Sequence, residues 1–161
     1  MLTRRMALSG GLAAIASVNL LQGPGARAAE EDHVVRTDAE WRSSLTAGQY
    51  AVLRKEGTEP PFTSPLLHEE RKGIFACAGC ASDLFSSATK FDSGTGWPSF
   101  WAPLDHAVNT HEDRTYFMVR TAVTCRRCDG HLGHVFDDGP KPTGLRYCMN
   151  GLALTFKPAT A

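Results

Sequence analysis

GIFACAGC, residues 73–80, places a short β-forming run directly before two cysteines that are separated by two residues. A second pair, in CRRC at residues 125–128, follows another β-rich run and lies 44 residues beyond the first pair. Two such pairs bring four thiolates within reach of one tetrahedral ion. We therefore expect a structural zinc that cross-links distant segments of a small β-core. Its ligands would be Cys77, Cys80, Cys125 and Cys128.

Disulfides are the main alternative for these four cysteines if the protein is exported, because oxidising compartments favour them. A four-thiolate iron–sulfur cluster is the second alternative. Two C-x-x-C pairs fit a metal better than two very small disulfide loops. A site closed by four cysteines has no open coordination position, so we assign it no chemistry.

The composition is that of one globular domain. The chain has 161 residues, of which 42% are hydrophobic and 21% are charged, and its formal net charge is zero. This length is sufficient for one hydrophobic core. The neutral balance argues against a basic surface for nucleic acid or anionic lipid.

The first 28 residues have the features of an export signal. Arg4 and Arg5 precede a weakly apolar run at residues 6–21, and the segment ends in the small-x-small pattern of residues 26–28. The arginine pair resembles a twin-arginine signal, so we expect cleavage after Ala28 and a periplasmic location. The mature domain would then span residues 29–161. An uncleaved membrane anchor is the alternative, although the run is short for a membrane span.

The mature chain is expected to be mainly β, with an α+β arrangement. Thr37 with Glu40 and Thr46 with Gln49 form capping boxes that predict two short helices, the second ending at Gly57. Strands are predicted after them, with a bend at Gly151 and a Gly/Ser-rich loop at residues 91–100. The predicted strands are residues 73–76, 115–124, 145–150 and 152–156.

The fifth cysteine, Cys148, lies alone in GLRYCMNG, residues 144–151. If this segment is a strand, Arg146, Cys148 and Asn150 share one face. We expect the guanidinium to favour the thiolate and to lower the pKa of Cys148. These features favour a nucleophile, while a buried structural cysteine or an intermolecular bridge are the alternatives.

Two further segments carry candidate functional residues. His131 and His134 lie in HLGHVFDDGP and suit general acid chemistry beside a thiolate. Metal binding or simple hydrogen bonding are the alternatives for both histidines. Trp97 lies in the glycine-containing stretch KFDSGTGWPSFW, where it would either cover the core or form the wall of an apolar pocket.

Together these motifs resemble the B-type peptide-methionine-R-sulfoxide reductases. The resemblance covers nearly all of residues 34–157, and HLGHVFDDGP followed by RYCMN is its most specific part. It implies two small antiparallel sheets with short helices outside them and a structural zinc remote from the chemistry. It also implies reduction of methionine-R-sulfoxide in oxidised proteins and peptides.

Residue roles follow from the same resemblance. Cys148 corresponds to the catalytic nucleophile and Trp97 to the wall of the pocket for the sulfoxide methyl group. His131 and His134 correspond to the groups that position and protonate the sulfoxide oxygen. The R preference also comes from the resemblance and not from the residues themselves.

Three further positions complete the site that the resemblance implies. Asn150 corresponds to a residue that holds water in the site. Arg146 and Asp138 correspond to the charged surroundings of the nucleophile. Attack by Cys148 would leave a sulfenic acid on its sulfur.

One position departs from the pattern of many family members. Where they carry a second, resolving cysteine before GWPSF, this chain has Thr95. We therefore expect a monomer whose sulfenic acid is reduced by an external thiol, supplied by a thioredoxin-like or glutaredoxin-like partner. A zinc-stabilised binding module without redox activity and a thiol–disulfide exchanger are the competing interpretations; the lack of a C-x-x-C pair free of zinc counts against the exchanger.

Overall fold

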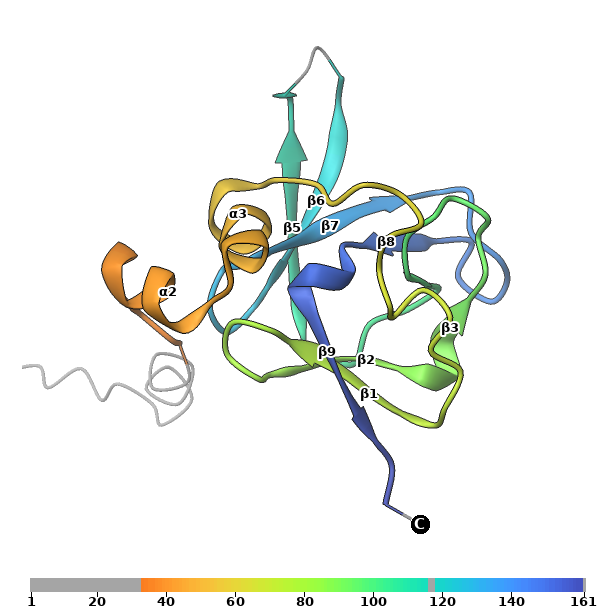
Figure 1. Ribbon diagram of the computed structural model, residues 1–161. Helices are drawn as coiled ribbons and strands as arrows, with labels where there is room; N and C mark the ends of the chain where they lie inside the picture. Colours follow the sequence, from red (N-terminus) through yellow and green to blue (C-terminus); the bar gives the residue numbers. More distant parts are fainter. Residues whose placement is uncertain (1–32, 116–117, 161) are drawn as a thin grey trace, which may run out of the picture. The chain divides into compact units, whose positions relative to one another are not determined.

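The computed structural model describes residues 33–115 and 118–160, which belong to one compact unit (Figure 1). The predicted export signal, residues 1–28, lies outside the described residues. Within the described ranges, no helix is both long enough and apolar enough to cross a lipid bilayer.

Both helices begin at the predicted capping boxes. Thr37 caps α2, Asp38–Ser44, and Thr46 caps α3, Ala47–Lys55. In each box the threonine side chain accepts a hydrogen bond from the backbone three residues later, and the side chain there accepts one from the threonine N–H. Each box therefore satisfies helix donors that would otherwise lack partners.

The end of α3 differs from the prediction by one residue. Glu56, not Gly57, takes the left-handed conformation, with φ of 56°. Gly57 instead donates a backbone hydrogen bond to Ala51 O over 2.9 Å. A Cβ on Gly57 would lie 2.9 Å from that same oxygen, so the glycine is needed for close approach and not for its φ.

A three-stranded antiparallel sheet carries the first cysteine pair. Its order is β2-β1-β9, with β1 at Gly73–Cys77, β2 at Asp83–Ser86 and β9 at Leu154–Pro158. Cys77 lies opposite Leu154, so the first cysteine pair is held beside the last strand of the chain. In the view of Figure 1, β9 crosses β1, with which it pairs over residues 73–77.

The other candidate site residues lie in or close to the strands of a six-stranded antiparallel sheet. Its order is β3-β4-β8-β7-β6-β5. The strand bounds are β3 Lys90–Phe91, β4 Ser99–Phe100, β5 Val108–Asp113, β6 Arg120–Cys125, β7 His131–Phe136 and β8 Arg146–Met149. Short 3-10 turns, η1 at Ser87–Thr89 and η3 at Gly151–Ala153, precede β3 and β9.

Three buried phenylalanines pack the two sheets together. Phe75 and Phe85 come from the smaller sheet and Phe100 from β4 of the larger one. The ring centroid of Phe100 lies 5.0 Å from that of Phe75 and 4.4 Å from that of Phe85. Burying a phenylalanine contributes about 1.5–3 kcal/mol to the free energy of folding. Because Phe100 belongs to β4, this contact also fixes the end of the loop that precedes β4.

The architecture agrees with the predicted one: mainly β, with two antiparallel sheets, two short helices and paired cysteine loops. The predicted strand at residues 115–124 is too long, because β6 begins at Arg120 and Met118 and Val119 are exposed outside it. Positions 116 and 117 lie outside the described residues. The predicted bend at Gly151 is a full 3-10 turn, so β9 begins at Leu154.

Strand β7 was not expected from the sequence. HLGHVF lacks a regular alternation of apolar and polar residues, and residues 131–133 are all buried, so both faces of the strand are covered there. The loop predicted at residues 91–100 likewise contains the ends of two paired strands, β3 and β4. His131 and His134 are thus strand residues and not loop residues.

Two glycine substitutions test this packing in opposite directions. In Gly133→Ala, the new Cβ would lie 2.1 Å from Cys148 O, so we expect a loss of about 1–3 kcal/mol of unfolding free energy. In Gly48→Ala the Cβ meets only the flexible end of Leu152 at 3.2 Å, and alanine favours the helix by about 0.5–1 kcal/mol. Urea unfolding of both variants measures the difference. Equal stability of Gly133→Ala and the parent chain would contradict the described β7–β8 pairing.

Candidate active site and metal centre

The four paired cysteines converge as predicted. Their Sγ atoms all lie within 4.8 Å of one another, and Cys148 is not part of this group. The Cys77–Cys128 and Cys80–Cys125 sulfur distances are 3.7 Å and 3.6 Å, far beyond the roughly 2.05 Å of a disulfide bond. Four thiol sulfurs in this arrangement fit a tetrahedral zinc ion, as the sequence predicts.

Tight turns shape each cysteine pair. Ala81 and Asp129 follow the second cysteine of each pair in the left-handed conformation and donate backbone hydrogen bonds to Cys77 O and Cys125 O. Arg54 of α3 donates to Cys128 O over 2.8 Å. The metal centre therefore joins the ends of β1 and β6 and is fastened to a helix.

Cys148 lies in the middle of β8 between two partner strands. Ser99 of β4 lies opposite it on one side and His134 of β7 on the other. Burial raises the pKa of the Cys148 thiol, although the Thr95 hydroxyl and the charge of Arg146 act in the opposite direction. The expected net lowering of this pKa is thus wrong, because desolvation outweighs the arginine.

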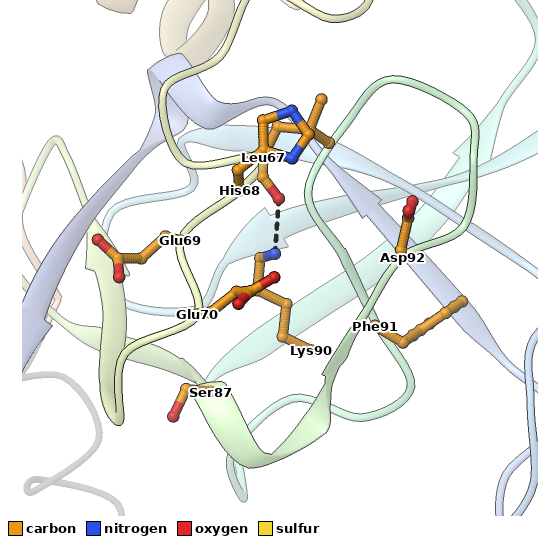
Figure 2. A pocket seen from close by; sticks show the side chains of 8 residues that line it. All are labelled: Leu67, His68, Glu69, Glu70, Ser87, Lys90, Phe91 and Asp92. Carbon is orange, nitrogen blue, oxygen red and sulfur yellow. Dashed lines mark hydrogen bonds between the residues drawn. The ribbon is translucent and has the colours of Figure 1, made fainter.

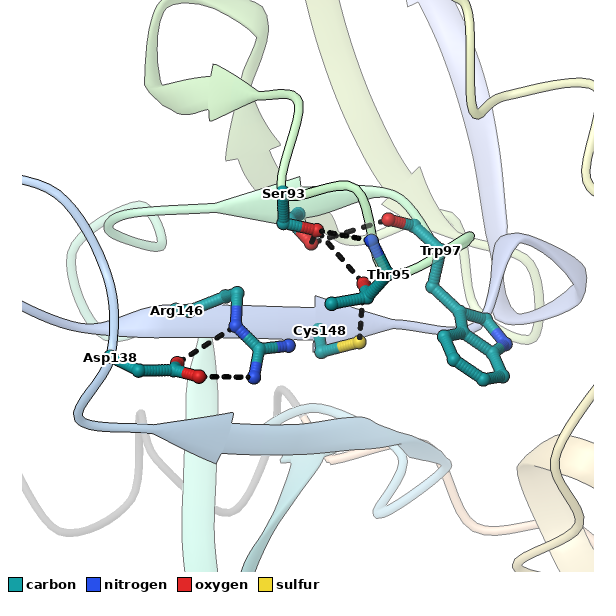
Figure 3. A network of polar contacts seen from close by, with 7 residues as sticks. Ser93, Thr95, Trp97, Asp138, Arg146 and Cys148 are labelled. Atoms are coloured by element: carbon teal, nitrogen blue, oxygen red, sulfur yellow. Dashed lines mark hydrogen bonds and ion pairs between the residues drawn. The ribbon is translucent and has the colours of Figure 1, made fainter. Parts of the chain in front are cut away.

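The predicted charged pair next to the nucleophile is present. Arg146 Nε and Nη2 each donate to a carboxylate oxygen of Asp138 over 2.8 Å (Figure 3). The guanidinium also lies over the ring of Phe136, 4.4 Å from its centroid. Arg146 is therefore held from two sides while it lies beside Cys148 on the same face of β8.

A small cavity of about 120 Å³ opens at Cys148. Trp97 forms part of the cavity wall, which was one of the two roles predicted for it. Its indole Nε1 donates to Glu59 O over 3.0 Å. The lining residues are Thr58, Trp97, Arg120, Phe136, Cys148 and Asn150. The cavity is far smaller than the pockets of about 300–1,000 Å³ that enclose whole ligands, so it suits the tip of a side chain.

Asn150 lines the cavity, but its amide is already engaged. Its Oδ1 accepts from the Glu59 N–H over 3.0 Å and its Nδ2 donates to Leu132 O over 3.1 Å. The carboxylate of Glu59 is buried and accepts from the backbone N–H groups of Gly151 and Leu152. Glu59 therefore fixes both Trp97 and Asn150, a role that no local sequence signal indicated.

His134 is oriented by a carboxylate that sequence reasoning missed. Asp113 at the end of β5 lies 2.8 Å from His134 Nε2 and accepts from Arg120 Nη2 over 2.7 Å. A carboxylate only accepts, so Nε2 carries the hydrogen and Nδ1 is the nitrogen that gains or loses a proton. Burial lowers the pKa of His134, and the bond to Asp113 opposes that shift.

His131 is more deeply buried than His134. It is 3% exposed, and neither ring nitrogen has a hydrogen-bond partner among the described residues. Burial, followed by the neighbouring His134, lowers the pKa of His131 to about 4. The two ring centroids are 5.3 Å apart. The structure thus brings both histidines to β7, with only His134 directly opposite Cys148.

A second cavity, of about 260 Å³, lies beside β3 (Figure 2). Lys90 reaches across it and donates from Nζ to Leu67 O over 2.7 Å. None of the predicted site residues lines this cavity in the described part of the chain. Its lining residues are Leu67, His68, Glu69, Glu70, Ser87, Lys90, Phe91 and Asp92.

Known proteins resemble this chain over most of its length. The SelR domain profile matches residues 45–158. A peptide methionine sulfoxide reductase MsrB from Agrobacterium fabrum is 54% identical over 126 residues, which is 78% of this chain and 93% of that protein. MsrB proteins from Methanosarcina mazei and Pseudomonas putida are 52% and 55% identical over 78% and 76% of this chain, and over 91% and 93% of their own lengths. The chain therefore belongs to the MsrB family of peptide methionine sulfoxide reductases, whose members carry the SelR domain.

Proposed function

We propose that this chain reduces methionine-R-sulfoxide in oxidised proteins and peptides, with Cys148 as the nucleophile. The observation that carries the proposal is the small cavity in which Cys148 lies with Trp97 and Phe136. Family membership favours an enzyme over a binding module without redox activity. A chiral cavity would discriminate between the two isomers, and the preference for R rests on the family resemblance.

The substrate requires an acid as well as a nucleophile. A sulfoxide reacts poorly because its oxygen is a poor leaving group, and protonation of that oxygen makes the sulfur open to attack. Trp97 and Phe136 provide apolar surface for the methyl group, and Cys148 lies at the same cavity. The cavity size matches the end of a methionine side chain and leaves the rest of the polypeptide outside.

His134 is the proposed acid. It lies opposite Cys148 in the sheet, and Asp113 holds its Nε2–H so that Nδ1 is left to carry the transferred proton. His131 supports it as a buried ring whose two nitrogens have no partner among the described residues and would hydrogen-bond the substrate oxygen or a water. Asn150 is proposed mainly to shape the cavity, because both ends of its amide bind the backbone.

Arg146 is proposed to stabilise negative charge on the Cys148 sulfur. Its bidentate pair with Asp138 and its contact with Phe136 hold the guanidinium in place. Because the guanidinium is already in position, little reorganisation is needed when the Cys148 thiolate forms. Arg146 therefore stabilises the thiolate during the reaction, while the resting cysteine stays a neutral thiol.

The reaction balances without any further group in the cavity. The Cys148 thiolate attacks the sulfoxide sulfur, and the protonated oxygen passes from that sulfur to the Cys148 sulfur. The products are methionine and a Cys148 sulfenic acid, so the cysteine sulfur loses the two electrons that the methionine sulfur gains. The proton comes from His134.

Recycling is proposed to need two external thiols. The first displaces water from the sulfenic acid and forms a mixed disulfide with Cys148. The second releases Cys148 and leaves as a disulfide. Thr95 stands where a resolving cysteine is expected, and the other four cysteines form the metal centre, so a thioredoxin-like or glutaredoxin-like reductant is the proposed partner of a monomeric enzyme.

Zinc is proposed to act structurally. Cys77, Cys80, Cys125 and Cys128 would fill all four coordination positions, which leaves none for substrate. The ion would supply a cross-link between the ends of β1 and β6 and take no part in the chemistry. Export through the twin-arginine-type signal of residues 1–28 is likewise a proposal; this route would let zinc bind before the folded chain leaves the cytoplasm.

The first prediction concerns stoichiometry. Mixed with excess peptide methionine-R-sulfoxide and no reductant, the zinc-bound chain from residue 29 should form about one methionine per enzyme, because nothing within the chain resolves the sulfenic acid. Chromatography of the peptide and a sulfenic-acid probe on Cys148 measure both products. Cys148→Ser should form none. Formation of an intrachain disulfide to Cys148 would rule out the external-thiol proposal.

The second prediction concerns pH. Below the His134 pKa, Cys148 and His134 are both protonated, so no thiolate forms. Above the Cys148 pKa, neither residue is protonated, so no acid remains. Only the state in which the two residues share one proton reacts. Burial lowers the His134 pKa below 6.5 and raises the Cys148 pKa above 9.0, which widens this range at both ends. The single-turnover rate should therefore show no titration limb with its midpoint between pH 6.5 and 9.0.

His134→Gln is the control for this profile. Without the acid the rate should fall by about 10²–10⁴-fold and should rise steadily with pH as the thiolate forms. Stopped single-turnover reactions across the range measure both enzymes. An acidic limb with its midpoint above pH 6.5 in the parent, or a flat profile in His134→Gln, would contradict the assigned acid.

The third prediction concerns the metal. The purified protein should contain one zinc per chain, and its removal by a chelator should lower the apparent Tm by about 10 °C or more, because the cross-link is lost. Elemental analysis and thermal unfolding measure this. Cys148→Ser should keep its zinc, whereas Cys125→Ser should lose it. Iron in place of zinc, or an unchanged Tm after complete removal, would refute the structural zinc.

A further inference from the structure

A chain of three hydroxyl groups leads to the Cys148 sulfur. Thr95 Oγ1 lies 3.8 Å from Cys148 Sγ, within hydrogen-bonding range for sulfur. Ser93 Oγ lies 2.8 Å from Thr95 Oγ1 and 2.7 Å from Ser99 Oγ (Figure 3). Ser99 is fully buried, lies opposite Cys148 in the sheet and has Trp97 O 3.2 Å away as an acceptor.

Each hydroxyl has one proton to donate, so the directions of these bonds are linked. If Ser99 donates to Trp97 O, then Ser93 must donate to Ser99 and Thr95 to Ser93. Thr95 Oγ1 is then an acceptor for the S–H of Cys148. In this arrangement each O–H points away from the sulfur, and every hydroxyl and the S–H has a hydrogen-bond partner when Cys148 is a neutral thiol.

The opposite arrangement fits the thiolate. A thiolate has no proton and needs a donor, so Thr95 must turn its hydrogen toward the sulfur. Ser93 then donates to Thr95, and Ser99 donates to Ser93. Only O–H rotations separate the two arrangements, since no heavy atom has to move. The same three side chains can thus serve both protonation states of Cys148.

We propose that Thr95 is a further catalytic residue: its hydroxyl donates a hydrogen bond to the Cys148 thiolate, and Ser93 and Ser99 support that bond by reversing their own O–H directions. This inference rests on the proposed function only in taking Cys148 as the nucleophile. The position at which a resolving cysteine is expected would then stabilise the attacking sulfur. Charge-assisted hydrogen bonds of this kind are stronger than neutral ones, which gives the relay a measurable effect.

The test follows the alkylation of Cys148 by iodoacetamide against pH in the zinc-bound protein, read by mass spectrometry of the Cys148 peptide. Thr95→Val keeps the shape and removes the donor. Its alkylation midpoint should move to higher pH by about one unit, a tenfold smaller thiolate fraction at neutral pH. Thr95→Ser keeps the hydroxyl and should keep the parent midpoint.

Ser93→Ala separates the relay from local effects, because Ser93 reaches the sulfur only through the neighbouring hydroxyls. Its midpoint should shift in the same direction by a smaller amount. A parent-like midpoint in Thr95→Val would overturn the proposal, and a shift in Thr95→Val without one in Ser93→Ala would overturn the relay. Zinc content and thermal unfolding confirm that each variant is folded.

Alkylation requires no sulfoxide, so its outcome is independent of the reductase activity. If the parent chain reduced no methionine sulfoxide but Thr95→Val still shifted the midpoint, the proposed function would fail and the hydroxyl relay would stand. If methionine were formed but the midpoint did not move, the relay would fail alone.

Discussion

The pairing of β8 with a strand on each side is the constraint on which the candidate site depends. Backbone hydrogen bonds place Ser99 on one side of Cys148 and His134 on the other. A slip of one residue would turn Cys148 to the opposite face of the sheet, away from both. The register is held from outside the site, because Phe100, the residue after Ser99, is packed between aromatic rings of the smaller sheet. The packing of the core therefore also determines the position of the Cys148 thiol.

Burial also sets the resting state of the reacting groups. The same desolvation raises the pKa of Cys148 and lowers that of His134, so both favour their neutral forms. In the proposed reaction the thiolate and the acid then arise together, by proton transfer, instead of waiting as a charged pair. Because the thiolate is the form that oxidants attack, a neutral resting thiol is better protected from reactions other than the intended one. The apolar wall that suits a methyl group thus also favours the neutral, less reactive form of Cys148.

Local features were the ones that the sequence could predict. A capping box needs only residues three apart, and C-x-x-C spacing alone brings two sulfurs together, so Thr37, Thr46 and the four metal cysteines were identified. Cys148, Trp97 and the two histidines were candidates from their local sequence, and the resemblance to a known family gave them specific roles. Contacts between distant residues were missed: Asp113 meets His134 across 21 positions, and Glu59 meets Gly151 across 92. The pKa of Cys148 was misjudged for the same reason, since a flanking arginine is visible in a sequence and burial is not.

Glu59 shows why such distant contacts matter to the site. A buried carboxylate is costly unless its oxygens are hydrogen-bonded, and this one accepts from two backbone N–H groups at the start of η3. Its own N–H binds Asn150 and its own carbonyl binds the indole of Trp97, so one residue engages two walls of the cavity and the turn that follows β8. Gly151 is required there, because a Cβ would lie 1.8 Å from Ser64 Oγ. The loop before the first sheet is therefore as much a part of the candidate site as the strand that carries Cys148.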